Sequence, residues 1–167
     1  MKKSFLFLIC VLFVAGCATK PIIKTQPKPE APKEEATQNE PGIRYADWQS
    51  VDEIKTINFD YDKSDLSSAA RDILKENSKF LEANKDINVL VEGHCDERGT
   101  TEYNLALGQR RAQAVREYYG KLGISLGRIG TISYGKEKPL DPGHNEDAWA
   151  KNRRAETKVR STNAAQK

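Results

Sequence analysis

Residues 87–122 read INVLVEGHCDERGTTEYNLALGQRRAQAVREYYGKL and contain the strand, loop and helix on which the fold depends. Every second residue of 87–91 is apolar and β-branched, which predicts a strand that ends at Gly93. Apolar side chains then recur at helical spacing over 102–122, and Gly123 is a typical residue to follow a helix. A polar loop bounded by glycines joins the two elements.

The same patterns predict five more elements around this unit. Strands are expected at 55–60, 128–134 and 155–160, and helices at 67–83 and 146–151, with a turn at 141–143. The order βαβαβ(α)β predicts an α/β sandwich, in which a mixed sheet has its helices packed on one face. This domain covers 51–162, a usual domain size, and has no internal repeat.

Composition excludes several classes of protein. The chain has 167 residues, of which 38% are hydrophobic, and its mean hydropathy of −0.70 excludes a protein with several membrane spans. With 27 basic and 24 acidic residues the net charge is +3, so there is no electrostatic reason to bind nucleic acid. Three cysteines and two histidines offer little material for a disulfide scaffold or a structural zinc site.

The N-terminus has the pattern of an export signal. Two lysines precede an unbroken apolar run over 5–15, 11 residues long. A helix needs about 20 apolar residues to cross a bilayer, so this run is typical of a signal peptide, here 1–16. It leads into VAGC at 14–17, which resembles a bacterial lipobox. That resemblance implies cleavage before Cys17, a diacylglycerol on its sulfur and a palmitoyl chain on its new amine. The alternative is an ordinary signal peptide with an incidental cysteine.

Lipidation has consequences for the mature chain. Cleavage leaves 25 basic and 24 acidic residues, so the chain becomes nearly neutral. Several acyl chains hold stably to a membrane, since each buried methylene contributes about 0.8 kcal/mol. Ala18 stands where an aspartate commonly signals retention in the inner membrane, which favours the outer membrane. Cys95 becomes the only free thiol, so it is either buried or able to form an intermolecular disulfide.

Residues 17–50 are interpreted as the lipidated N-terminus and a flexible linker. Five of the seven prolines lie between 20 and 42, among Lys, Glu, Gln and Thr. Such a segment buries too little apolar surface to offset its ordering entropy, so we expect disorder. A coil of about 25 residues spans on the order of 25–30 Å, and a polyproline-like chain up to about 75 Å. Tyr45 and Trp48 are expected to lead into the domain, and 163–167 form a tail.

Four polar features do not lie where packing alone would place them. Three carboxylates follow the first strand within 60–65, and the glycine-bounded loop 93–99 follows the second. Arg111 lies in a helical stripe, at positions 107, 111, 115, 118 and 122, that is otherwise apolar or aromatic. The sequence NRR at 152–154 comes directly before the last strand.

The position of Arg111 needs an explanation, because an unpaired buried charge costs several kcal/mol and must find an anion or a carbonyl. Asp96 is the nearest carboxylate in sequence that the loop can bring to it. Held across a shallow cleft, the two side chains can bind a zwitterion, the guanidinium taking its carboxylate and the aspartate its ammonium. An internal Asp96–Arg111 salt bridge is the alternative. Asp60 and Asp65 have the simpler alternative of capping the first helix.

Five segments match one family in order, namely FDYDKSD at 59–65, VEGHCDERGT at 91–100, EYNLALGQRRA at 102–112, SYGKEKP at 133–139 and KNRRA at 151–155. Over about 57–160 the chain closely resembles the peptidoglycan-associated lipoproteins of the OmpA C-terminal-like superfamily. The resemblance implies an OmpA-C-like fold that binds peptidoglycan non-covalently, through the diaminopimelate of its stem peptide. It implies a binding protein, with no catalytic residue, cofactor or metal.

The resemblance also implies roles for particular residues. The family's ligand-binding aspartate and arginine correspond to Asp96 and Arg111. Cys95 departs from the family, in which Thr, Ala or Asn is usual at this position; no effect on the ligand is expected. Further residues that match positions in or beside the family's cleft are Asp62, Leu107, Asn152 and Arg153.

The partners that the resemblance implies are the cell wall, the outer membrane and the Tol system. Among Tol components it points to the periplasmic TolB propeller, which competes with peptidoglycan for an overlapping surface. Such Tol-Pal-type systems maintain envelope integrity and constriction during cell division. The implied location is the periplasmic face of the outer membrane, reached through the lipid anchor.

Two alternative functions are weighed against this one. A lipoprotein of the same fold can serve a motility or secretion machine instead. A murein hydrolase would need the residues of 94–97 as a metal site or a Cys-His dyad. Adjacent loop residues rarely point at one metal ion, and the sequence signals neither an oriented base nor an oxyanion hole.

Overall fold

The computed structural model describes residues 47–161, and its elements follow the predicted order. The signal peptide 1–16, the lipidation residue Cys17, the linker as far as residue 46 and the tail 163–167 lie outside the described residues. The strands are β1 (Ile57–Asn58), β2 (Ile87–His94), β3 (Ile129–Gly135) and β4 (Arg154–Ser161). The helices are α1 (Ser68–Ala83), α2 (Thr101–Lys121), the 3-10 helix η1 (Leu126–Arg128) and α3 (Glu146–Asn152).

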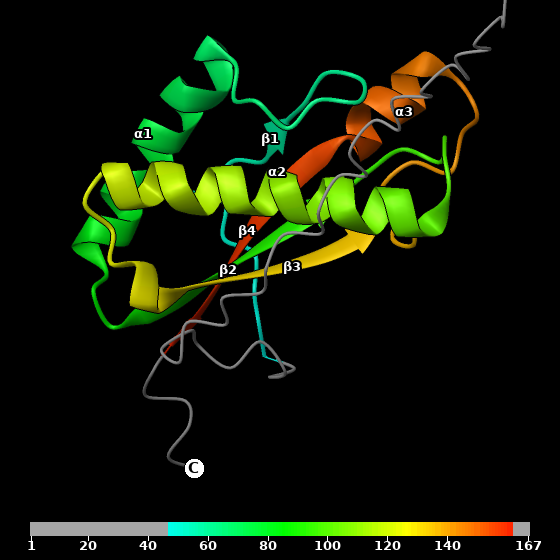
Figure 1. Cartoon of the computed structure of the whole chain (residues 1–167). Coiled ribbons are helices and arrows are strands. Elements are labelled where there is room, and N and C mark those ends of the chain that lie inside the picture. The colour runs from blue at the N-terminus through cyan, green and yellow to red at the C-terminus, as the bar shows by residue number, and fades with distance from the viewer. Residues whose placement is uncertain (1–46, 162–167) are drawn as a thin grey trace, which may run out of the picture. The chain divides into compact units, whose positions relative to one another are not determined.

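The four described strands form one mixed sheet in the order β1-β4-β2-β3. β2 and β3 are parallel, whereas β4 lies between β1 and β2 and is antiparallel to both. Figure 1 shows α1 and α2 on the same face of the sheet, and α3 at the end where β4 begins. The predicted α/β sandwich, with helices on one face of a mixed sheet, is therefore confirmed.

The core lies between the sheet and the two long helices. Val89 and Val91 of β2 are fully buried in it, on the face that the alternation predicts. On α2 the fully buried aromatic residue is Tyr119, whereas Tyr118, which the predicted stripe contains, is only partly buried. The stripe advances by four residues from 107 to 115, and another step of four gives 119. The hydroxyl of Tyr119 lies 3.3 Å from that of Thr157, which satisfies the buried phenol.

Hydroxyl side chains cap the two long helices. Ser67 precedes α1, and its hydroxyl accepts a hydrogen bond over 3.1 Å from the N–H three residues further on. Thr100 does the same for α2 over 3.2 Å. The capping role considered for Asp60 and Asp65 is wrong, because a residue adjacent to the helix already fills it.

The first strand is shorter than the predicted 55–60. Only Ile57 and Asn58 pair with β4, and the N–H of Phe59 donates a further hydrogen bond of 2.9 Å to the carbonyl of Arg153. The chain leaves the sheet there. The acidic stretch that follows therefore lies in a loop beside the start of β4.

Two glycines let β2 and α2 approach through their backbones. A Cβ atom on Gly93 would lie 1.9 Å from the carbonyl oxygen of Gly108. A Cβ atom on Gly108 would lie 2.3 Å from the hydroxyl of Ser133 on β3. Because neither residue has a side chain, the N-terminal half of α2 can lie directly against the end of β2.

Contacts with the sheet begin before residue 51. Gln49 and Val159 of β4 exchange two backbone hydrogen bonds of 2.9 and 2.8 Å. Asp47 accepts a hydrogen bond of 2.6 Å from Nε of Arg160. Trp48 is half-buried, as expected of a segment leading into the domain, and Tyr45 lies outside the described residues. Over 47–161 no helix has the length and apolar character that a membrane span requires.

Candidate functional site

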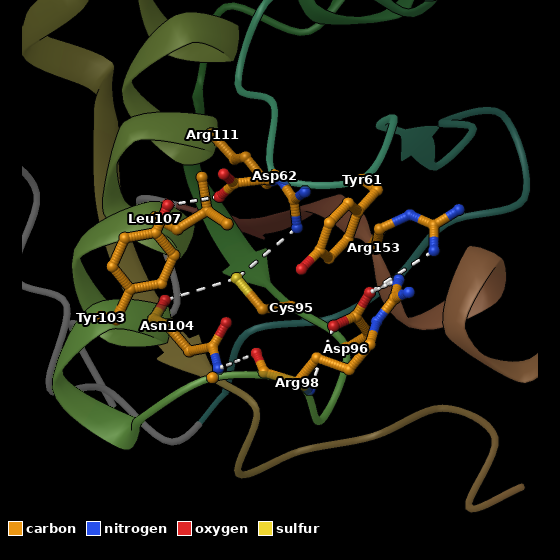
Figure 2. Close-up of a pocket in the computed structure, with 11 residues that line it drawn as sticks. Tyr61, Asp62, Cys95, Asp96, Arg98, Tyr103, Asn104, Leu107, Arg111 and Arg153 are labelled. Atoms are coloured by element: carbon orange, nitrogen blue, oxygen red, sulfur yellow. Dashed lines mark hydrogen bonds and ion pairs between the residues drawn. The ribbon is translucent and has the colours of Figure 1, made fainter. Parts of the chain in front are cut away.

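A pocket of about 190 Å³ lies where β2 ends and α2 begins. Its walls come from the loop after β1, the loop between β2 and α2, α2 itself and the residue before β4. Figure 2 shows two polar clusters on either side of Cys95: Asp62 with Tyr103, and Asp96 with Arg98 and Arg153. The lining residues are Tyr61, Asp62, Cys95, Asp96, Arg98, Gly99, Tyr103, Asn104, Leu107, Arg111 and Arg153.

The loop between β2 and α2 is fixed by backbone contacts. The pairing of β2 with β3 shifts register at the end of β2, and the N–H of Cys95 then donates to the carbonyl of Gly135 over 2.8 Å. From α2, the side-chain amide of Asn104 donates to the carbonyl of Arg98 over 2.9 Å. An irregularity of this kind at a strand end turns the following side chains in a new direction. Here it turns the polar side chains of the loop toward the pocket.

Asp96 is buried and held by two arginines. Its carboxylate accepts hydrogen bonds of 2.6 Å from the Arg98 guanidinium, 3.2 Å from the Arg98 N–H and 3.4 Å from Arg153. Burial opposes ionisation, but these hydrogen bonds outweigh it and hold the pKa of Asp96 below its ordinary value. The internal salt bridge between Asp96 and Arg111, considered from the sequence, does not form.

Arg111 finds backbone carbonyls instead of a carboxylate. Its guanidinium donates to the carbonyls of Lys63 (2.8 Å), His94 (2.8 Å) and Asp60 (3.1 Å), and it approaches the sulfur of Cys95 at 3.5 Å. The side chain is fully buried and borders the pocket. Within 47–161 no carboxylate forms an ion pair with it, so a positive charge without an anionic partner lies at the pocket wall.

Arg98 is a lining residue that the sequence analysis did not select. Its guanidinium makes cation–π contacts with two aromatic rings, 4.0 Å from the centroid of Tyr61 and 4.2 Å from that of Trp149. Glu97 orients the second ring by accepting a hydrogen bond of 2.8 Å from Nε1 of Trp149. Tyr61, Arg98 and Trp149 are far apart in sequence, and no local pattern marks them. The one sequence feature that could have indicated Arg98 is its position in the loop, two residues after the predicted Asp96.

Asp62 lies on the opposite side of the pocket. Its φ of 55° is in the left-handed region, which a short polar residue such as Asp tolerates. The hydroxyl of Tyr103 on α2 donates a hydrogen bond to the Asp62 carboxylate, and this bond raises the pKa of Tyr103. The contact joins the loop after β1 to the start of α2. Leu107, one turn further along α2, adds an apolar surface to the pocket.

Cys95 and His94 do not form a catalytic pair. The thiol of Cys95 donates to the carbonyl of Asn104 over 3.3 Å, and burial raises its pKa to about 11. The imidazole of His94 stacks on Tyr134 at 5.5 Å between centroids, and burial lowers its pKa to about 4. Cys95 is buried, one of the two states expected for it. In the described part of the chain no group of three or more His, Cys, Asp or Glu residues could hold a metal ion.

Five of the six predicted site residues line this pocket, namely Asp62, Asp96, Leu107, Arg111 and Arg153. Asn152 does not. Its side-chain oxygen accepts hydrogen bonds of 2.7 and 3.0 Å from the N–H groups of Leu140 and Asp141, and its amide donates to the carbonyl of Asp141 over 2.7 Å. Asn152 therefore holds the loop before α3, and a part in ligand binding stays a prediction.

Known proteins are similar to this chain in both sequence and fold. The OmpA family model matches residues 58–153. The peptidoglycan-associated lipoprotein of Haemophilus influenzae is 43% identical over 144 residues, which cover 86% of this chain and 93% of that protein. The protein of the same name from Pseudomonas aeruginosa is 46% identical over 113 residues, 68% of this chain and 67% of that one.

Among solved structures, the crystal structure of the peptidoglycan-associated lipoprotein from Burkholderia pseudomallei matches with a TM-score of 0.62 and 40% identity. It covers 64% of this chain and 90% of that chain. The matched segment holds every residue that lines the pocket, since 58–153 includes them all. The chain therefore belongs to the OmpA family and, within it, to the peptidoglycan-associated lipoproteins.

Proposed function

We propose that this protein binds peptidoglycan non-covalently and that the pocket holds the diaminopimelate residue of a stem peptide. The observation that carries the proposal is the charge pattern of the pocket, in which three guanidiniums and two carboxylates line about 190 Å³. Family membership supports it, because relatives in this family are named for their association with peptidoglycan.

Diaminopimelate fits this pattern because the far carbon of its side chain bears both an ammonium and a carboxylate. Asp62 and Asp96 supply negative charge, and Arg111 supplies a positive charge that forms no ion pair with a carboxylate of the described residues. Leu107 offers an apolar contact to the methylenes between the two ends of the ligand. Interactions between charges are stronger here than at an open surface, because the surrounding protein is less polarisable than water.

The chain belongs to a family of binding proteins and not to a family of enzymes. We infer that it works as a tether. A lipid on Cys17 would hold one end at the periplasmic face of the outer membrane, and the folded domain would hold the wall. Many anchored copies facing one polymer bind by avidity, even where a single domain binds weakly.

We further propose that the protein acts with a Tol-type system in envelope integrity and constriction during cell division. Its partner there would be a TolB-like periplasmic propeller that docks over the same pocket. The support for this partner is the resemblance to the family alone. Competition between the propeller and the wall follows directly if both use the pocket.

Co-sedimentation with purified sacculi tests the proposal. We expect the detergent-solubilised full chain to sediment with sacculi and Asp96→Asn to lose most of this binding, because Asp96 is the acceptor that orients Arg98 and Arg153. Asp72→Asn is the matched control, since that exposed aspartate lies on α1, outside the pocket, and pairs with Lys75. A purified TolB-like propeller is expected to release the bound protein.

Wild-type binding by Asp96→Asn would contradict the assignment of the pocket. Absence of sedimentation by the unmodified protein would contradict wall binding itself. The supernatant separates binding from hydrolysis, because a murein hydrolase releases soluble muropeptides and a binding protein releases none.

A further inference from the structure

The sheet has a second face, turned away from α1 and α2 (Figure 1), which we call the outer face. β2 turns its odd-numbered side chains to the core, so the alternation of a strand places Leu90 and Glu92 on the outer face. α3 lies at the end where β4 begins, so among the described helices none covers the centre of this face. The partners of Leu90 and Glu92 there are Gly130 and Ile132 on β3, and Lys158 and Glu156 on β4.

The centre of the outer face is apolar and buried. Leu90 is 1% exposed, and Ile132 is partly buried. Gly130, the partner of Leu90 on β3, has no side chain that could shield it. A sheet face is normally buried by packing against another layer of structure. Because the described helices do not supply that layer here, we expect a segment outside 47–161 to supply it.

One carboxylate on the outer face lacks a cation. Glu156 is paired with Arg154 and Lys158, each at 2.6 Å. Glu92 lies directly opposite Glu156, and within 47–161 His94 is the one basic side chain close enough to pair with it, at 3.9 Å. Burial lowers the pKa of His94 to about 4, so the imidazole is uncharged at neutral pH. Like charges on opposite residues destabilise a sheet, so a cation beside Glu92 would be favourable.

The residues before β1 bring the chain to this face. Gln49 exchanges two backbone hydrogen bonds with Val159, and alternation turns its neighbours Trp48 and Ser50 to the outer side. The hydroxyl of Ser50 accepts a hydrogen bond of 2.6 Å from the ammonium of Lys158. Nε1 of Trp48 is buried, and no residue of 47–161 accepts its hydrogen bond. The preceding chain therefore begins beside the outer face, next to a donor that lacks an acceptor.

The segment that directly precedes the described residues, 43–46, reads IRYA. Ile43 and Tyr45 are two positions apart, so an extended chain puts both side chains on one side. Arg44 gives the segment a positive charge, and it has no acidic residue. Four extended residues span about 13 Å, enough to lead from the edge of β4 to the centre of the sheet. The covalent link holds the segment at an effective concentration on the order of millimolar.

We propose that residues 43–46 dock on the outer face and form the missing cover of the sheet. The two apolar side chains of the segment lie on Leu90 and Ile132. Its arginine lies beside Glu92, and one of its carbonyls accepts the hydrogen bond from Trp48. This docking goes beyond the proposed function and does not depend on it. The free part of the tether then ends at residue 42, and the membrane anchor leads away from the face opposite the helices.

Methyl NMR on the detergent-solubilised full chain, labelled with carbon-13 at its Ile and Leu methyl groups, tests this. We expect nuclear Overhauser contacts from Ile43 and Tyr45 to the methyl groups of Leu90 and Ile132. Tyr45→Ala should shift both methyl resonances, because the ring current is lost, and should lower the melting temperature by about 3 °C. The matched controls are Ile43→Ala, which should shift the same resonances, and Ile23→Ala, which should leave them and the melting temperature unchanged.

Charge reversal tests the place of Arg44. Arg44→Glu puts a second carboxylate beside Glu92 and should abolish the contacts, whereas Lys24→Glu, further back in the linker, should keep them. Contacts that survive Arg44→Glu would overturn the pairing with Glu92.

The docking itself is overturned if Ile43 and Tyr45 show no contact with the outer face in the unmodified protein. A mixture of labelled and unlabelled chains distinguishes one further occupant. Contacts that join a labelled chain to an unlabelled one would assign the face to a second copy of the protein and would overturn docking within one chain.

Discussion

Arg111 shows how one side chain joins separate segments of this chain. Its guanidinium bonds to the loop after β1 through the carbonyls of Asp60 and Lys63, and to the end of β2 through the carbonyl of His94. The same guanidinium makes a cation–π contact with Phe59, 5.1 Å from the ring centroid. Arg111 therefore shapes the pocket walls as well as charging them.

We predict that Arg111→Ala lowers the free energy of unfolding by about 3 kcal/mol or more, because three backbone carbonyls lose their donor in a buried place. Urea unfolding followed by circular dichroism measures it. Arg110→Ala, one residue earlier and exposed, should change stability by less than about 0.5 kcal/mol. Equal stability of the two variants would show that water replaces the guanidinium.

For single residues, the sequence predicts burial and the kind of partner that a side chain needs, but not which residue supplies that partner. The helical stripe showed that Arg111 must be buried and must find an anion or a carbonyl, and it is buried against carbonyls. The sequence does not tell whether a carboxylate or a carbonyl accepts from Arg111, because that depends on where the loop after β1 turns. For the same reason the role of Arg98 could not be predicted, since its ring partners Tyr61 and Trp149 are distant in sequence.

Among the elements, the contact between β2 and α2 fixes the geometry of the pocket most directly. It depends on Gly93 and Gly108, whose missing side chains let backbone lie against backbone. Four of the lining residues come from α2 and four from the loop that joins it to β2. A small change in the spacing of these two elements therefore moves most of the pocket.

We predict that Gly93→Ala lowers the free energy of unfolding by about 3 kcal/mol, because the new methyl would overlap the carbonyl oxygen of Gly108 and backbone cannot move aside alone. Gly108→Ala should cost less, because its methyl first meets the movable hydroxyl of Ser133. Thermal unfolding of both variants gives the comparison. A smaller loss in Gly93→Ala than in Gly108→Ala would contradict this account.

Element prediction succeeded where periodicity is strong. The bounds of α1, α2 and β2 agree with the predicted ones within two residues, because each has a clear apolar face or alternation. β1 is two residues rather than the predicted six, since strand length depends on how far its neighbour continues to pair and not on local pattern. The alternative that Asp60 or Asp65 caps α1 is also wrong, because Asp and Ser both serve as caps and only the exact helix start separates them.

On the scale of the whole molecule, the proposed lipid anchor is Cys17, which lies outside the described part of the chain. We predict that Cys17→Ser yields an unlipidated protein that fractionates away from the outer membrane, because one thioether and one amide attach all the acyl chains. Membrane fractionation of cells, with Cys95→Ser as the matched cysteine control, measures it. Recovery of Cys17→Ser entirely with outer membranes would place the anchor elsewhere.

The ends of β4 lie on the path between the two proposed attachments, the wall at the pocket and the lipid on Cys17. Arg153, directly before β4, bonds to Asp96 in the pocket, and Val159, near its other end, pairs with Gln49 on the segment that leads back toward the linker. The six residue-to-residue steps from Arg153 to Val159 span about 20 Å in a strand. Tension between wall and membrane would therefore pull lengthwise along a central strand whose cross-strand hydrogen bonds lie perpendicular to the force. Those bonds would share the strain together in shear instead of unzipping one after another, which suits a mechanical connector.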